Sequence, residues 1–221
     1  MTTISENIPL GELIDTYPLA SKVLLKYGLD FCCGGRRSLV EACAASGVDQ
    51  ERVLEELKAS LESPPERTWS SASTEELVRH ILDVYHRPLP EMLSHLEALV
   101  SRVFEVHGDR DVERLSALKG AVFELSSDLS GHMMKEEAIL FPWILSNRQP
   151  GPMGPIQVML MEHDAAGRLL EKIATLTDDF QAPDGACATW RSLYAGLQKM
   201  DEELRTHIHL ENNILFPRVL E

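Results

Sequence analysis

Apolar residues along the chain recur mostly at intervals of three and four positions, as they do on one face of a helix. Val53, Leu54, Leu57 and Leu61 show this spacing, and the sequence has no period-two runs of β-branched residues. The pattern therefore predicts an all-α protein.

Proline and glycine interrupt this pattern in a few places. The main interruption is the stretch LESPPERTWSS at 61–71, which contains Pro64-Pro65. We expect a small helical domain over residues 1–62, a linker over 63–72 and a larger domain over 73–221. The small domain is predicted to hold two or three short helices around the segment Asp30-Phe31-Cys32-Cys33-Gly34-Gly35.

The larger domain is predicted to contain four long helices joined by short loops. Ser73, with Glu76 three positions later, is a capping signal for the first helix, and Pro183-Asp184 can open the last. Such an arrangement favours an up-down four-helix bundle. The four predicted helices span roughly residues 74–106, 112–146, 155–179 and 185–220.

An internal repeat is the most informative feature of the sequence. The segment His132–Leu145 aligns without gaps with His207–Leu220, and seven of the fourteen positions are identical. Each copy contains a histidine followed four positions later by a glutamate, and then Ile, Leu, Phe and Pro. An acidic residue also lies four positions before each histidine, Asp128 in one copy and Glu203 in the other.

Residues four apart on a helix lie about 40° apart around its axis, so each repeat aligns His and Glu on one face. An imidazole and a carboxylate that face a bundle core need compensation, and a bound metal is the usual source. His86 precedes His132 by 46 residues and His163 precedes His207 by 44, so each repeat has a partner histidine at near-equal spacing. Four histidines with Glu136 and Glu211 thus provide three ligands for each of two metals. This donor set favours iron or manganese, with zinc as an alternative.

The other histidines fit this centre less well. On one continuous helix, His107 would lie about 31 Å from His86, so it reaches the same centre only if the first helix ends early. His95 is about 180° from His86 around the helix, and His209 about 200° from His207. Both are therefore expected to face outward.

Composition narrows the possible partners. The chain has 221 residues, with 21 Lys and Arg against 35 Asp and Glu, for a formal charge of −14. This charge repels nucleic acid and anionic membranes. No apolar run approaches the roughly 20 residues that a membrane span needs, and four unevenly spaced cysteines do not suggest a disulfide framework. We therefore expect a soluble cytoplasmic protein.

The sequence resembles the Repair of Iron Centres (ScdA-type) family of haemerythrin-like proteins. The resemblance rests on the repeated His-x-x-x-Glu and Leu-Phe-Pro motifs, on Glu162-His163-Asp164, on Leu10-Gly11-Glu12-Leu13 and on the Cys32-Cys33-Gly34-Gly35 segment. It implies a haemerythrin-like bundle with two non-haem irons under an oxo or hydroxo bridge. The ligands it implies are His86, His132, Glu136, His163, His207 and Glu211, with Glu136 and Glu211 bridging. The sequence departs from the family after His86, where Arg87-Pro88-Leu89-Pro90 replaces further polar residues that include a second histidine.

The resemblance also implies a function: repair of iron–sulfur clusters damaged by nitric oxide or peroxide, in the cytoplasm, by a homodimer. The partners would be damaged iron–sulfur proteins and nitric oxide or oxygen. If the centre reduces nitric oxide, Asp128, Glu203 or Glu162 would relay protons. Two alternatives are a carrier or sensor of diatomic gases without turnover and, prompted by His163-Asp164, a metal-dependent phosphohydrolase.

Cys32 and Cys33 are adjacent, so a disulfide between them would be strained and easily reduced. We expect them to accept or pass on nitrosyl groups, electrons or iron; the alternative is that they are two small core residues. Cys43 and Cys187 carry no functional signal in the sequence.

Overall fold

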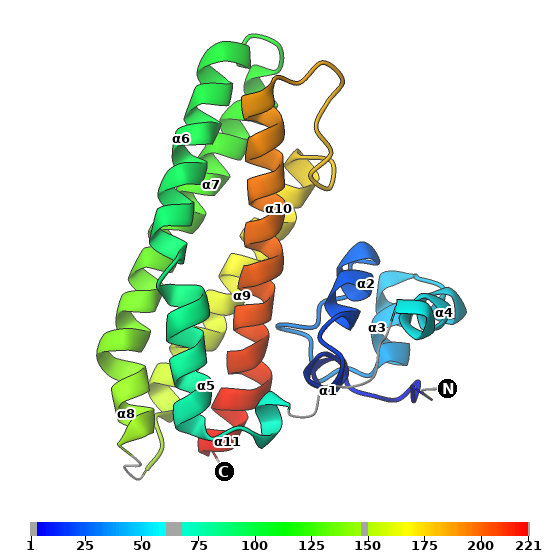
Figure 1. Ribbon diagram of the computed structural model, residues 1–221, viewed down its shortest axis with the longest axis vertical. Helices are drawn as coiled ribbons and strands as arrows, with labels where there is room; N and C mark the ends of the chain where they lie inside the picture. The colour runs from blue at the N-terminus through cyan, green and yellow to red at the C-terminus, as the bar shows by residue number, and fades with distance from the viewer. Residues whose placement is uncertain (1–3, 61–67, 147–149, 221) are drawn as a thin grey trace. The chain divides into compact units, whose positions relative to one another are not determined.

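The computed structural model describes residues 4–60, 68–146 and 150–220, and the described residues are helical apart from turns, loops and one isolated bridge (Figure 1). This confirms the all-α prediction. Residues 61–67, which include half of the predicted linker and both of its prolines, lie outside the described residues. The chain forms two compact units. Met1–Arg79 and Arg205–Glu221 make up the first, and His80–Leu204 the second.

The second unit is a bundle of long amphipathic helices that lie side by side (Figure 1). Helix α6 packs on α7 and α7 packs on α9, and leucines and valines such as Leu96, Val100, Leu118 and Leu125 fill the space between them. Short connections make consecutive helices antiparallel, as predicted. The long helices are α6 (Leu89–His107), α7 (Val112–Lys135), α9 (Met153–Leu176) and α10 (Ala188–His209), whose last turn belongs to the first unit.

The helices of the bundle contain short π-helical turns, which the sequence pattern does not predict. The turn η2 (Ile81–His86) precedes α6, η3 (Glu136–Leu140) joins α7 to α8 (Phe141–Leu145), and η4 (Leu210–Leu215) joins α10 to α11 (Phe216–Leu220) in the first unit. The predicted start of the last helix at Pro183-Asp184 was wrong. These residues precede a turn at Gly185, whose φ is +75°, and the helix begins at Ala188.

Within the described residues 4–60, the first unit contains four short helices, where two or three were predicted. They are α1 (Leu10–Thr16), α2 (Ala20–Lys26), α3 (Leu39–Ser46) and α4 (Gln50–Ser60), and α4 packs on both α2 and α3. Leu13, Leu24, Phe31 and Leu57 are almost fully buried between them. The 3-10 helix η1 (Trp69–Ser71) and α5 (Thr74–His80) follow.

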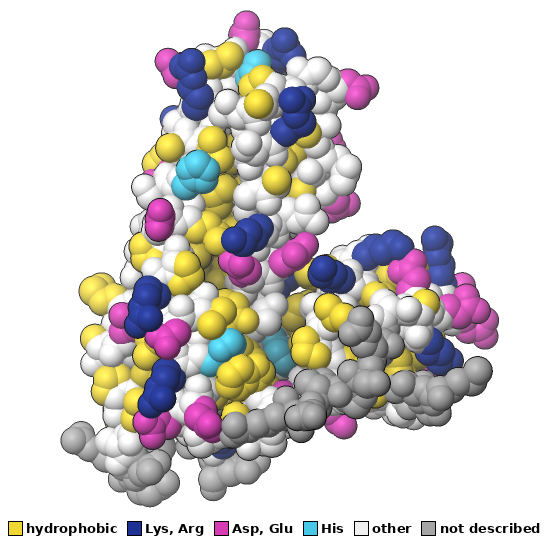
Figure 2. Space-filling model, viewed as in Figure 1, with side chains coloured by type: hydrophobic (Ala, Val, Ile, Leu, Met, Phe, Trp, Pro, Cys, Tyr) yellow, Lys and Arg dark blue, Asp and Glu magenta, His cyan; other side chains and the backbone are white. Residues whose placement is uncertain are grey.

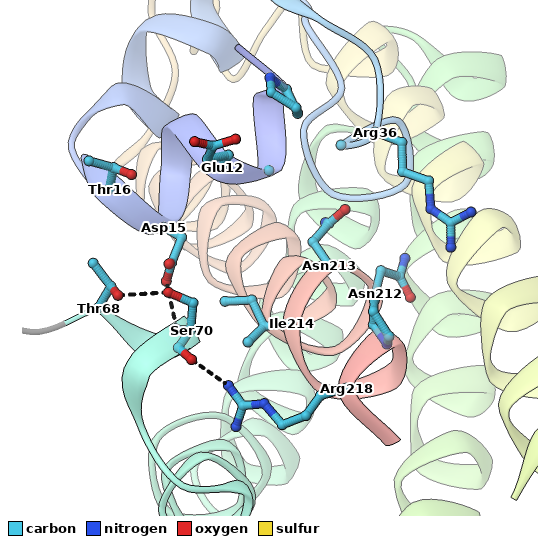
Figure 3. A pocket seen from close by; sticks show the side chains of 14 residues that line it. Glu12, Asp15, Thr16, Arg36, Thr68, Ser70, Asn212, Asn213, Ile214 and Arg218 are labelled. Atoms are coloured by element: carbon cyan, nitrogen blue, oxygen red, sulfur yellow. Dashed lines mark hydrogen bonds between the residues drawn. The ribbon is translucent and has the colours of Figure 1, made fainter. Parts of the chain in front are cut away.

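The C-terminal segment is tied to the rest of the first unit by hydrogen bonds. The Arg218 guanidinium donates to the carbonyls of Trp69 and Ala72 and, as Figure 3 shows, to the carbonyl of Ser70. The Asp15 carboxylate accepts the backbone N–H groups of Trp69 and Ser70. A cavity of about 680 Å³ lies among these elements.

Charged side chains of both signs are interspersed along the bundle on the face shown in Figure 2. Among the described residues, no helix combines the length and the apolar composition that a membrane crossing requires.

Candidate metal centre

Four of the predicted ligands meet inside the second unit. His86 ends η2, His132 lies in the last turns of α7, Glu136 begins η3 and His163 lies near the middle of α9. All four are buried, and Glu136 has no exposed surface. One donor atom from each of His132, Glu136 and His163 lies within 4.8 Å of the other two. The structure therefore brings these four buried side chains together.

Imidazole nitrogens surround the Glu136 carboxylate. Its Oε2 lies 3.2 Å from Nε2 of His132 and 3.4 Å from Nε2 of His86. The Nε2 atoms of His132 and His163 are 3.1 Å apart. His86 lies in the cluster although Pro88 and Pro90 follow it closely. It is the last residue of a π-turn, in which the N–H of Arg87 bonds to the carbonyl of Leu82, five residues earlier.

Two carboxylates hold the outer nitrogens of this cluster. Oε1 of Glu137 lies 2.9 Å from Nδ1 of His86, and Oε2 of Glu162 lies 2.9 Å from Nδ1 of His132. A carboxylate at Nδ1 favours the tautomer with its proton there, which leaves the lone pair of Nε2 facing inward, as in metal-binding histidines. Glu162 also accepts a hydrogen bond from Lys135. Burial alone would raise the pKa of Glu162, but hydrogen bonds from Lys135 and His132 lower it below its usual value.

The Glu136 carboxylate provides a test of whether these residues fit a metal. Both of its oxygens are buried and accept no hydrogen bond from the described protein. A buried carboxylate needs a counter-charge, and the inward nitrogens of neutral imidazoles offer lone pairs rather than protons. A cation among these atoms would supply the counter-charge for the carboxylate and accept the imidazole lone pairs. The nitrogen and oxygen donors suit iron. The residues therefore fit the metals that the sequence predicts.

The second repeat lies in the first unit and shows the same local pairing. His207, near the end of α10, and Glu211, in η4, are both buried, and Nε2 of His207 lies 3.2 Å from Oε1 of Glu211. His132 and Glu136 in the first repeat show the same distance, 3.2 Å. The repeat in sequence is thus a repeat in local structure.

Proline explains the π-turn in both repeats. Pro142 and Pro217 each lie six residues after the glutamate and lack the N–H that would bond four residues back. The preceding N–H groups bond five residues back instead, from Phe141 to Glu136 and from Phe216 to Glu211. The helix continues without a break, and each glutamate lies at a wide turn of the kind that often occurs at functional sites.

The three predicted proton relays differ in their surroundings. Glu162 contacts a histidine of the cluster, whereas Asp128 is exposed on α7. Glu203 is half-buried, with its carboxylate 3.7 Å from the ammonium of Lys199. Together with burial, which has the larger effect, the charge of Glu203 raises the pKa of Tyr85 to about 12.

The remaining histidines lie outside the cluster of the second unit. His95 is exposed, as predicted. His107 ends α6, where its ring lies against Trp190 and its Nε2 is 3.4 Å from Sγ of Cys187. The prediction that His209 faces outward was wrong: His209 is buried, with its ring edge toward Phe31. Helical phase separates it from His207 but does not show that a segment from the N-terminal part covers it.

Glu137 is a site residue that sequence reasoning missed. The second repeat has Asn212 at the equivalent position, so Glu137 does not stand out in the alignment. Asp164, by contrast, is exposed next to the buried His163. The His-Asp pair that prompted the phosphohydrolase alternative therefore does not enter one site together.

Comparison with known proteins agrees with this arrangement. Residues 77–219 match the Hemerythrin HHE cation binding domain, and residues 6–61 match the ScdA_N domain, a domain of unknown function (DUF542). The chain is 43% identical over 215 residues to proteins of Cronobacter sakazakii, Citrobacter koseri and Escherichia coli, with 96% of each chain covered. Each of these relatives is named iron–sulfur cluster repair protein YtfE. The chain belongs to the YtfE family of haemerythrin-type proteins with an N-terminal ScdA domain.

Proposed function

We propose that the chain is a di-iron protein that repairs iron–sulfur clusters damaged by nitrosative and oxidative stress. The observation that carries the proposal is the convergence of His86, His132 and His163 on the buried Glu136 carboxylate, which accepts no hydrogen bond. The names of the relatives support the repair role. Damaged iron–sulfur proteins would be the clients.

The six proposed ligands are two carboxylates and four imidazoles. The matched haemerythrin segment, 77–219, includes all six, and helix α10 runs unbroken toward His207. We propose that Glu136 and Glu211 bridge the two ions, and that an oxo or hydroxo group completes the bridge. The ligands are His86, His132, Glu136, His163, His207 and Glu211.

A reduced pair of irons supplies two electrons and open positions for a small diatomic molecule such as nitric oxide or oxygen. The protein contributes a water-poor, pre-arranged site. Glu137 and Glu162 hold the protons on Nδ1 of His86 and His132, so that the inner nitrogens keep their direction. Glu162 is the predicted relay that contacts a ligand, and movement of its proton would be coupled to the Lys135 ammonium. The roles of Asp128 and Glu203 as proton relays remain predictions.

Iron content and reaction with nitric oxide test the proposal. Iron-loaded protein is expected to hold two irons per chain, and anaerobic nitric oxide is expected to change the optical spectrum of the centre. Glu136→Gln should lose iron, whereas Asp164→Asn, at an exposed carboxylate next to His163, should retain it. Absence of a pair of irons from the unaltered protein, or full retention by Glu136→Gln, would contradict the proposal.

The product distinguishes reduction of nitric oxide from simple binding. Formation of nitrous oxide with oxidation of the centre would identify turnover. Reversible spectra without a product would identify a carrier or sensor at the same site. A client assay then measures recovery of a nitric oxide-damaged iron–sulfur enzyme, and failure to restore it would contradict the repair role while leaving the iron site intact.

We also propose that the protein is a cytoplasmic homodimer. Large apolar side chains are exposed on the packed helices α7 and α9 and on η3 between them, where a second copy would cover them. These residues are Met134, Ile139, Met153, Val158 and Met161.

A further inference from the structure

A second cluster of metal-binding side chains lies in the first unit, on the turn that follows α2. One donor atom from each of Asp30, Cys32 and Cys33 lies within 4.8 Å of the other two. Cys32 is buried and Cys33 is partly exposed, so the cluster has an open side. Both thiols are free, with their sulfurs 3.8 Å apart.

The backbone of the turn fixes the carboxylate. Oδ1 of Asp30 accepts the N–H of Cys32 at 3.0 Å and the N–H of Cys33 at 2.9 Å, and the Cys32 thiol is 3.2 Å from the same oxygen. Gly34 permits this close approach, because a Cβ there would lie 2.7 Å from the carbonyl oxygen of Asp30 and 3.2 Å from its Oδ2. The three donors are therefore held in place before any ligand binds.

Two asparagines of η4 hold the turn from the other side. The side-chain amides of Asn212 and Asn213 both donate to the carbonyl of Cys32, at 3.2 and 3.1 Å. They lie beside the loop that carries Arg36 (Figure 3). Gly35 is required here, since a Cβ would lie 2.3 Å from Oδ1 of Asn213. These asparagines replace the Glu137 and Ala138 of the first repeat, so the two repeats differ where the second contacts the cysteine turn.

The distance between the sulfurs suits one metal ion. Two thiolates at a Zn–S distance of about 2.3 Å in tetrahedral geometry place their sulfurs about 3.8 Å apart. The sulfurs of Cys32 and Cys33 are 3.8 Å apart, much farther than the roughly 2.05 Å of a disulfide.

The charges of the cluster also favour a cation. The two thiols and the Asp30 carboxyl group place three donor atoms within 4.8 Å of one another. Three acidic groups thus crowd one small volume, and a bound cation would stabilise their deprotonated forms together.

We propose that Asp30, Cys32 and Cys33 form a site for one divalent thiophilic metal ion, bound by two thiolates and one carboxylate. The open side at Cys33 leaves a fourth position for water or for a ligand from another molecule. This site shares no residue with the six proposed iron ligands, so the two proposals succeed or fail separately.

Titration of the full-length, iron-loaded protein with Co²⁺ under anaerobic conditions tests the site. We expect a thiolate-to-cobalt charge-transfer band that saturates at one Co²⁺ per chain, while the iron content stays constant. Zn²⁺ and Fe²⁺ should each abolish the band by competition. No thiolate band at excess Co²⁺, or a band that appears only as iron is lost, would overturn the proposal.

Variants assign the band to its ligands. Cys32→Ser and Cys33→Ser should each remove it, and Asp30→Asn, which keeps the oxygen that accepts the backbone N–H groups, should weaken Co²⁺ binding by about tenfold or more. Cys43→Ser and Cys187→Ser are the matched controls and should leave it unchanged. A band that persists in the Cys32→Ser, Cys33→Ser double variant would overturn the proposal, and unchanged affinity in Asp30→Asn would remove the carboxylate from the site.

Discussion

Glu137 and Glu162 show how single residues prepare the centre before metal binds. Each carboxylate pairs with Nδ1 of a histidine whose Nε2 faces Glu136. The hydrogen bond at Nδ1 therefore sets the direction of the lone pair on Nε2. The two differ in what holds them: Glu162 is tied to Lys135, while the side chain of Glu137 is half-exposed. Glu162 is therefore the better position for a test.

Glu162→Gln should weaken iron binding without unfolding the bundle. The amide oxygen can still accept the proton on Nδ1 of His132, but the negative charge that raises the basicity of the ring is lost. Loss of such a partner lowers metal affinity by about 10–100-fold. Competition with a chelator measures the affinity, with Asp164→Asn as the control at an exposed neighbouring carboxylate. Equal affinity in both variants would show that Glu162 does not support the centre.

The buried histidine and glutamate side chains proposed as ligands were easier to predict from sequence than the residues around them. His132, Glu136, His207 and Glu211 repeat at one spacing, and a duplicated polar pair in a core needs an explanation. Glu137 has no counterpart in the second repeat. His209 and the cysteine turn depend on contacts between segments far apart in the chain, which helical periodicity does not describe.

At the scale of elements, the repeated Phe-Pro pair changes the hydrogen bonding of the helix that contains it. Each proline removes one N–H, and the chain responds with a π-turn rather than a break. Apolar spacing of three and four predicts the long helices well but is too coarse to detect one extra residue in a turn. The capping signal at Ser73 was confirmed, because its hydroxyl and backbone N–H bond to Glu76 and the N–H of Glu76 bonds to Ser73.

Ser73→Ala should lower the free energy of unfolding by about 1 kcal/mol, since it leaves an N–H at the start of α5 without its side-chain acceptor. Chemical denaturation followed by circular dichroism measures the change. Ser127→Ala, at an exposed position within α7, is the matched control and should change stability by less than about 0.5 kcal/mol. Equal effects of the two substitutions would show that the cap contributes nothing specific.

At the scale of the whole molecule, the exposed apolar side chains of α7, η3 and α9 predict a dimer. One charged residue introduced among them should weaken it. Val158→Glu places a carboxylate among them and should shift the protein toward monomer in sedimentation equilibrium, because association would bury the charge. Val112→Glu, at an exposed valine at the start of α7, should leave the association unchanged. A monomeric unaltered protein would contradict the dimer itself.

The stability of the molecule should depend on its metals. The buried Glu136 carboxylate lacks a hydrogen bond, and metal that binds only the native state stabilises it by about 2.7 kcal/mol at a concentration a hundred times Kd. For a chain of this size, removal of iron should therefore lower Tm by roughly 5–11 °C. Differential scanning calorimetry of iron-loaded and chelator-treated protein measures the shift. Glu136→Gln is the control, because its Tm should not respond to iron; equal Tm values for the loaded and treated forms of the unaltered protein would show that the buried cluster is stable without a cation.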